Sequence, residues 1–124
     1  MGIREIIVDY IPKIIPEIGD RVYYGFIPED ETTTPALAYL VSDEFEQMDL
    51  EGLPYAQQAT VRFGIICEDV LLMDTIKARM LNLIGPGKLP DVQLITLADA
   101  GDADPDLTLN MQLVGYEITL VFHL

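Results

Sequence analysis

The sequence predicts an α+β domain in which two amphipathic helices cover one face of a mainly antiparallel sheet. Two stretches repeat apolar residues with the spacing of a helix, at 3–14 and at about 70–84. Other stretches alternate β-branched and aromatic residues with polar ones, as half-buried strands do. The resulting order is α-β-β-β-α-β-β, and because no fixed-period repeat or linker interrupts it, we expect one domain over residues 1–124.

Each predicted helix has an apolar stripe and a recognisable end. The first stripe consists of Ile3, Ile6, Ile7, Tyr10, Ile11 and Ile14. Pro12 has no N–H to donate to the carbonyl of Val8, so we expect this helix to kink or loosen before Pro16. The second helix follows Asp69, whose carboxylate can cap it, and it should end at the sequence GPG, residues 85–87.

Five strands are predicted, at 21–28, 36–47, 60–68, 91–98 and 111–124. The third has the clearest alternation, since Val61, Phe63, Ile65 and Cys67 share one side of it. A polar loop should connect the first two strands. The acidic sequence DAGDADPDL, residues 99–107, should connect the last two.

The net charge argues against binding to nucleic acid or to anionic lipid. The chain holds 21 acidic and 7 basic residues, with a formal net charge of −14, and the basic residues are scattered. No apolar run approaches the roughly 18 to 20 residues that span a bilayer, and the first ten residues do not resemble a signal peptide. A single cysteine, Cys67, forms no intrachain disulfide and suits a reducing compartment. We therefore expect a protein that neither enters a membrane nor binds DNA specifically.

The chain is unusually apolar for its charge, which predicts contact with other subunits. Half of its residues are hydrophobic and the mean hydropathy is +0.27, although 23% of the residues are charged. A small domain with such a surplus commonly buries it in an interface between subunits. A homo-oligomer is therefore expected.

Nothing in the sequence predicts catalysis or a cofactor. The only histidine, His123, is the penultimate residue, and the only serine, Ser42, lies where a strand meets an acidic turn, so a hydrolytic triad has no support. Cys67 alternates in register with apolar residues, as a buried and inert thiol does. The sequence GPGK at 85–88 lacks the spacing of a phosphate-binding loop. We expect no catalytic, cofactor-binding or metal-binding residues, and no enzyme.

The aspartates of the acidic segment leave two interpretations open. Asp102, Asp104 and Asp106 match the first ligands of a calcium loop. However, Leu107 stands where that loop needs glycine, and Leu113 stands where it needs a bidentate glutamate. The segment is therefore a solvated or subunit-facing acidic loop, with a weak Ca²⁺ or Mg²⁺ site as the alternative.

Several local sequences, taken in order, resemble one known family. They are EIGDRVYYGFIPE, PALAYLVSDEF, ATVRFGIICED followed by VLLMDTIKARMLNLIG, and the final GYEITLVFHL. Together they are similar to the tail completion or tail terminator proteins of long-tailed bacteriophages. The resemblance implies a structural α+β subunit that forms a ring, commonly a hexamer. The ring caps the tail tube, stops its polymerisation and forms the head-tail joining surface. It also implies tail tube protein and head connector proteins as partners, DNA that passes through without specific binding, and a place in the virion after assembly in the host cytoplasm.

Two other functions remain open at this point. One is a head-tail connector or tail tube component of the same particle, which differs in its partner more than in its fold. The other is a soluble ligand-binding or enzyme-accessory domain, which predicts a pocket for a small molecule and a monomer or dimer.

Two sets of residues are candidates for contacts in such a ring. Acidic residues cannot all lie in dry interfaces, so they line or rim a lumen that repels DNA phosphates, or they keep an apolar subunit soluble. The candidate acidic residues are Asp43, Glu44, Glu46, Asp99, Asp102, Asp104 and Asp106. Three apolar residues lie among acids in the segment 42–53 and either contact a neighbour or pack within their own loop, namely Met48, Leu50 and Leu53.

Overall fold

The computed structural model of this chain describes residues 2–28, 30–31, 33–48, 54–103 and 113–124. The predicted order α-β-β-β-α-β-β is confirmed, with two short elements added to it. The elements are α1 (Ile3–Ile14), the 3-10 helix η1 (Pro16–Ile18), β1 (Val22–Tyr24), β2 (Ala36–Met48), β3 (Pro54–Cys67), α2 (Val70–Leu81), β4 (Gly85–Pro86), β5 (Leu94–Ala103) and β6 (Val114–His123).

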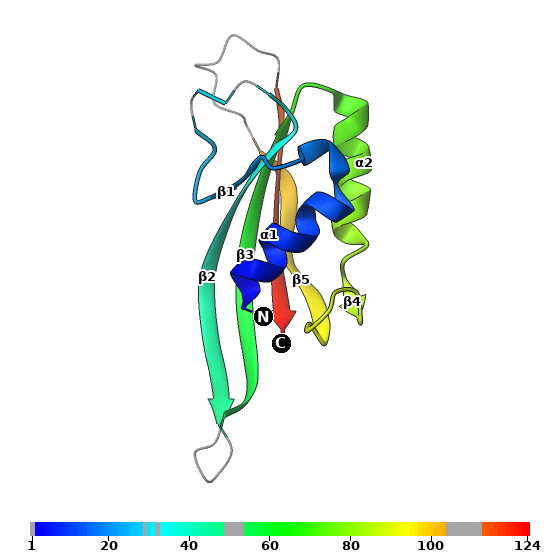
Figure 1. Cartoon of the computed structure of the whole chain (residues 1–124). Coiled ribbons are helices and arrows are strands. Elements are labelled where there is room, and N and C mark those ends of the chain that lie inside the picture. Colours follow the sequence, from blue (N-terminus) through cyan, green and yellow to red (C-terminus); the bar gives the residue numbers. More distant parts are fainter. Residues whose placement is uncertain (1, 29, 32, 49–53, 104–112) are drawn as a thin grey trace.

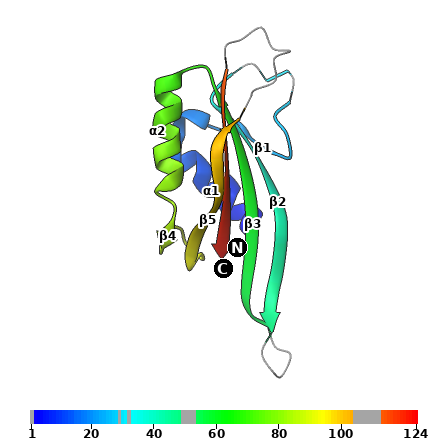
Figure 2. The ribbon, with the colours of Figure 1, turned by 180° about the vertical axis from the view of Figure 1, so that it is seen from behind.

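One mixed sheet forms the centre of the fold, with strand order β1-β2-β3-β6-β5-β4. All neighbouring pairs are antiparallel except β1 and β2, which are parallel. Both helices lie on the same face of the sheet (Figure 1). Seen from behind, the opposite face has no helix over it (Figure 2). We call this second surface the open face. The hairpin of β2 and β3 extends beyond the body of the domain (Figure 1).

The core lies between the helices and the sheet. The predicted stripe of α1 is buried at Ile3, Ile6, Ile7 and Ile11, which agrees with the helical spacing. On the sheet, Phe63 of β3 and Phe122 of β6 pack edge to face with ring centroids 6.3 Å apart. Burying a side chain of this size contributes about 1.5–3 kcal/mol. The alternation read from the sequence therefore identifies the face that the helices cover.

The end of α1 agrees with the prediction, and the end of α2 differs from it. Helix α1 continues through Pro12 to Ile14, and the chain then enters η1 at Pro16. Val8 is half exposed, so water can satisfy the carbonyl that Pro12 leaves without a donor. Helix α2 ends at Leu81, three residues before the expected Ile84. Neither helix of the described residues is long and apolar enough to span a membrane.

The start of the acidic segment is part of a strand, which corrects the prediction of a connecting loop over residues 99–107. Strand β5 runs to Ala103 and pairs with β6 along that length, with a bulge between Leu97 and Asp99. The small residues Ala100 and Gly101 fit beside β6 at little steric cost. Backbone pairing therefore overrides the weak strand propensity of this sequence.

Candidate assembly surfaces

The first candidate surface is the exposed start of α2. The carboxylate of Asp69 caps this helix by accepting hydrogen bonds from the backbone N–H groups of Leu71 at 2.9 Å and Leu72 at 3.3 Å, as predicted. The cap places Val70 and Leu71 on the outside, where they are 57% and 76% exposed. Large apolar side chains that stay this exposed are typical of a surface that a partner covers.

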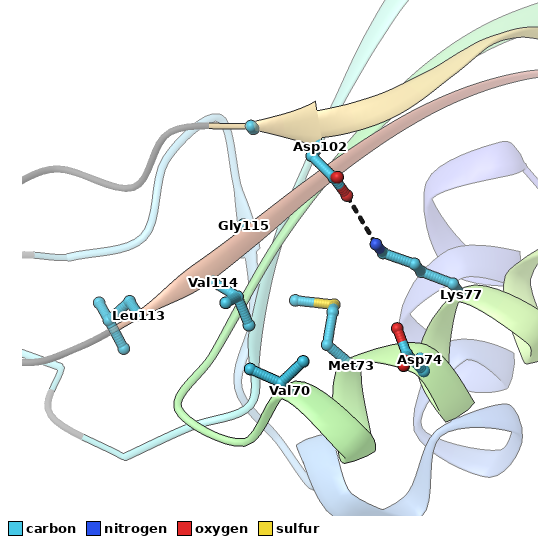
Figure 3. A pocket seen from close by; sticks show the side chains of 9 residues that line it. Val70, Met73, Asp74, Lys77, Asp102, Leu113, Val114 and Gly115 are labelled. Atoms are coloured by element: carbon cyan, nitrogen blue, oxygen red, sulfur yellow. Dashed lines mark hydrogen bonds and ion pairs between the residues drawn. The ribbon is translucent and has the colours of Figure 1, made fainter.

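Beside this apolar surface lies a hollow of about 320 Å³ between α2 and the adjoining ends of β5 and β6. Apolar side chains of Val70, Met73, Leu113 and Val114 line one part of it, and Lys77 stands at another part, reaching Asp102 of β5 (Figure 3). The Lys77 Nζ and Asp102 Oδ1 atoms are 2.6 Å apart.

Lys77 and Asp102 balance each other's charge at this hollow. The hydrogen bond to Asp102 raises the pKa of Lys77 above its ordinary value, and the ammonium also lies 5.2 Å from the centre of the Tyr116 ring. Burial raises the pKa of Tyr116, so the phenol stays neutral at physiological pH. The hollow therefore offers a partner an apolar lining and a local ion pair, with the carboxylate of Asp74 as a further negative charge in its lining.

A close approach of two strands forms the end of the hollow. A Cβ atom at Gly115 of β6 would lie 2.5 Å from the carbonyl oxygen of Ala103 in β5. Only glycine fits this place without moving a backbone. The sequence alone carries no signal for this role, because the contact joins residues on two different strands.

A second apolar surface follows β1, which is an edge strand of the sheet. Phe26 is 75% exposed, and Tyr24 packs its ring edge to face against Tyr39 of β2 at 5.4 Å. Arg4 of α1 lies over the Tyr24 ring, 5.6 Å from its centre. The domain thus carries exposed apolar residues on two separate elements, at the start of α2 and after β1.

The open face of the sheet is mainly polar. A hollow on it is lined by Arg62, Asp99, Gly101, Glu117 and Thr119, among others. The carboxylates of this hollow outnumber its single guanidinium, so it is negatively charged.

His123 lies on the open face as a strand residue, as predicted. Its Nδ1 atom is 2.9 Å from Nε2 of Gln58, and its Nε2 atom is 3.5 Å from Oγ1 of Thr96. These contacts tie β3, β6 and β5 together, which is a structural role. Cys67 is also as predicted, with 1% of its surface exposed and a pKa raised by burial.

The predicted acidic residues do not form one cluster in the described structure. Asp99 and Asp102 lie in β5, while Asp43, Glu44 and Glu46 lie in β2. In the strand register Asp43 lies opposite Thr60, Glu44 opposite Ala59 and Glu46 opposite Gln57. Asp104 and Asp106 lie outside the described residues. Among the described residues there is no group of three or more His, Cys, Asp or Glu side chains that could hold a metal ion.

The apolar candidates are placed only in part. Met48 is the last residue of β2, and Leu50 and Leu53 lie outside the described residues. The exposed residues Val70, Leu71 and Phe26 were not predicted as contact residues. A signal for the first two exists in the sequence: four apolar residues in a row, 70–73, cannot all face the core from one helix.

Neither the known protein families nor the curated proteins contain a sequence match to this chain. Among solved structures, the chain is similar to a chain of the virion of a native gene transfer agent particle, with a TM-score of 0.61 and 9% sequence identity. The similarity covers 94% of this chain and 87% of that chain. The two chains therefore share a fold over nearly their whole lengths.

Proposed function

We propose that this chain is a structural protein of a phage-like virion. The observation that carries the proposal is the fold shared, over nearly all of both chains, with a chain of a gene transfer agent virion. A fold alone does not define a function. The apolar surfaces on α2 and after β1 add independent support, because a subunit of an assembly needs contacts on more than one side.

Within the virion, the chain caps the tail tube as a ring and provides the joining surface for the head. The resemblance of its sequence to tail terminator proteins supports this role. So do the exposed apolar residues on two separate elements, Leu71 of α2 and Phe26 after β1, since identical subunits in a ring contact each other through two different surfaces. The same role needs no bond-making step, and we propose that the protein is not an enzyme.

The acidity supports a passage for DNA. We assign part of the negative charge, with Asp99 and Glu117 of the open face, to the wall of a lumen that repels phosphate. If Asp99 and Glu117 are changed to Asn and Gln and assembled particles deliver DNA unchanged, these two residues serve solubility instead.

The experiment that tests the function mixes purified protein with growing tail tubes and examines them by negative-stain electron microscopy. We expect a ring at the tube end and an arrest of growth. Tubes that lengthen by adding this protein would identify a tube component instead. A protein that ignores tubes and binds a small molecule as a monomer would support the ligand-binding alternative.

A matched pair of variants links this test to the surface of α2. Leu71→Asp places a charge on the exposed apolar surface and should abolish capping without unfolding the domain, because Leu71 is not part of the core. Thr75→Asp adds the same charge one turn further along the exposed side of α2, without removing an apolar side chain. Equal loss of capping in both variants would show that added charge, and not the apolar contact, is responsible.

A further inference from the structure

We infer that copies of this chain join edge to edge, with β5 of one copy adding antiparallel to β2 of the next. The inference rests on the proposed ring and names the contact that closes it. Strand β1 pairs with β2 only at residues 37–39, and β4 pairs with β5 only at Leu94 and Ile95. No described strand covers the outer edge of β2 at 40–48 or that of β5 at 96–103. These two uncovered edges have nearly equal length and carry backbone groups that a further strand can pair with.

The strand directions suit such a seam. Strands β2, β3, β6 and β5 are antiparallel in succession, so β2 and β5 run in opposite directions. Rotation about an axis roughly parallel to the strands keeps those strand directions from one copy to the next. The neighbour's β2 therefore meets β5 in antiparallel orientation. Because the two edges differ, the contact is head to tail, which is the kind of contact that builds a ring when the rotation between copies closes.

The register shows that the two edges are offset within one copy. Leu40 of β2 is level with Arg62 in β3, Thr119 in β6 and Asp99 in β5. Without a shift, only about four residues of each edge would face each other. A shift of about four residues along the strands brings the whole of 40–48 beside 96–103. This shift is even, so it keeps open-face residues opposite open-face residues, and Leu40 then meets Ala103 of the neighbour.

That offset is what a closed ring of inclined strands requires. Four strands span about 19 Å across the sheet, and four residues span about 13 Å along it. Together these lengths incline the strands by about 35° to the ring axis. Closed barrels have strand tilts of about 35–45°. The uncovered edges of this chain therefore match each other in length, direction and offset.

Both uncovered edges carry acidic residues, which repel each other across the seam. The sequence 40–48 contains Asp43, Glu44 and Glu46, whereas 96–103 contains Asp99 and Asp102, of which only Asp102 has its charge balanced by Lys77. Like charges opposite each other weaken strand pairing. Raising the ionic strength from about 0.1 M to 1 M shortens the screening length from about 10 Å to about 3 Å. The seam should therefore close at high salt and stay open at low salt.

Disulfide trapping tests the seam. Leu40→Cys and Ala103→Cys are combined in a Cys67→Ala background and oxidised in 1 M NaCl. Within one copy these positions are three strand spacings apart across the sheet, about 14 Å, and four residues apart along it, about 13 Å, so they are about 20 Å apart and too far for a disulfide. We expect a ladder of linked multimers on a non-reducing gel, and only traces of dimer from either single variant. Leu40→Cys combined with Asp99→Cys, which reports the unshifted register, should link poorly.

Three results would overturn the inference. Single variants that form dimers as well as the pair does would show that like edges pair. Efficient linking of Leu40→Cys with Asp99→Cys would refute the shift. Absence of a ladder of linked multimers in 1 M NaCl would refute the seam. This holds both when negative-stain images show rings and when they show none. Capping of tubes without a ladder refutes the seam alone, whereas a ladder from protein that never engages tubes refutes the proposed function alone.

Two variants with the same net charge test whether negative charge at the edges weakens the seam. Asp99→Asn should lower the apparent dissociation constant of the copies at 0.1 M salt by about two- to fivefold per seam, because it removes a negative charge from the position diagonal to the neighbour's Asp43 in this register. Asp9→Asn makes the same change in net charge on the exposed side of α1, away from both edges, and should leave association unchanged. Sedimentation velocity measures both variants. Equal effects of the two substitutions would show that only net charge matters, and would refute a specific repulsion at the seam.

Discussion

Asp99 and Asp102 are three positions apart in one acidic run, yet they lie on opposite faces of the sheet. Asp99 is level with Thr119 on the open face, and Asp102 is level with Tyr116 on the face that the helices cover. There Asp102 binds Lys77 of α2. One acidic segment thus serves two purposes, since one carboxylate fastens a helix and the other adds to the charge of the open face.

Gly115→Ala should destabilise the domain by about 1–3 kcal/mol. The added Cβ would lie 2.5 Å from the Ala103 carbonyl oxygen, so β5 and β6 must separate locally. Gly64→Ala is the control, because a Cβ there meets nothing within 4 Å although it is also in a strand. Urea denaturation measures both variants. Equal losses would show that glycine in a strand, and not the close approach, is what matters.

Phe63→Ala should cost about 3–5 kcal/mol of unfolding free energy, because it leaves a cavity beside Phe122 in the centre of the core. Phe26→Ala removes the same number of atoms from a side chain that is 75% exposed, and should change stability by less than about 0.5 kcal/mol. Thermal or chemical unfolding compares the two. A large loss at Phe26 would contradict its assignment to a contact surface.

Asp69→Ala should cost about 0.5–2 kcal/mol, because it removes the side chain that accepts hydrogen bonds from the first turn of α2. Asp69→Asn keeps an oxygen in the same place and should be close to wild type. The comparison uses denaturant unfolding. If both substitutions cost the same, the charge of Asp69 is what stabilises the helix start.

Acidification should weaken the contact between η1 and α2. Arg79 donates a hydrogen bond of 2.6 Å to Glu17, and this bond lowers the pKa of Glu17 below its ordinary value of 4.5. A carboxyl whose pKa is lower in the folded state stabilises the fold above about pH 4.5, and this contribution is lost as the pH falls through the lowered value.

The measurement for this contact is urea unfolding at a series of pH values. Glu17→Gln should lose less stability than wild type on acidification below about pH 4.5. In an Arg79→Ala background the same substitution should have little further effect on the pH dependence. An undiminished effect in that background would assign the shift to groups other than Arg79.

Much of the fold could be predicted because local periodicity carries it. The stripe of α1 from Ile3 to Ile11 and the alternation of Val61, Phe63 and Ile65 in β3 each identify the buried side of one element without any knowledge of the others. The cap at Asp69 is equally local, since it joins residues two and three positions apart. These features follow from the chain in sequence order.

The contact surfaces could not be predicted in this way. Whether Leu71 is exposed, which edges of β2 and β5 lack a neighbour, and why Gly115 must be glycine all depend on residues far apart in the chain. The acidic run was expected to be a loop, and pairing with β6 made its first part a strand with Asp99 and Asp102 on different faces. Periodicity determines which side of each element is apolar. Only tertiary packing decides which apolar sides are covered and which edges stay open, because burial and strand pairing are properties of neighbours in space.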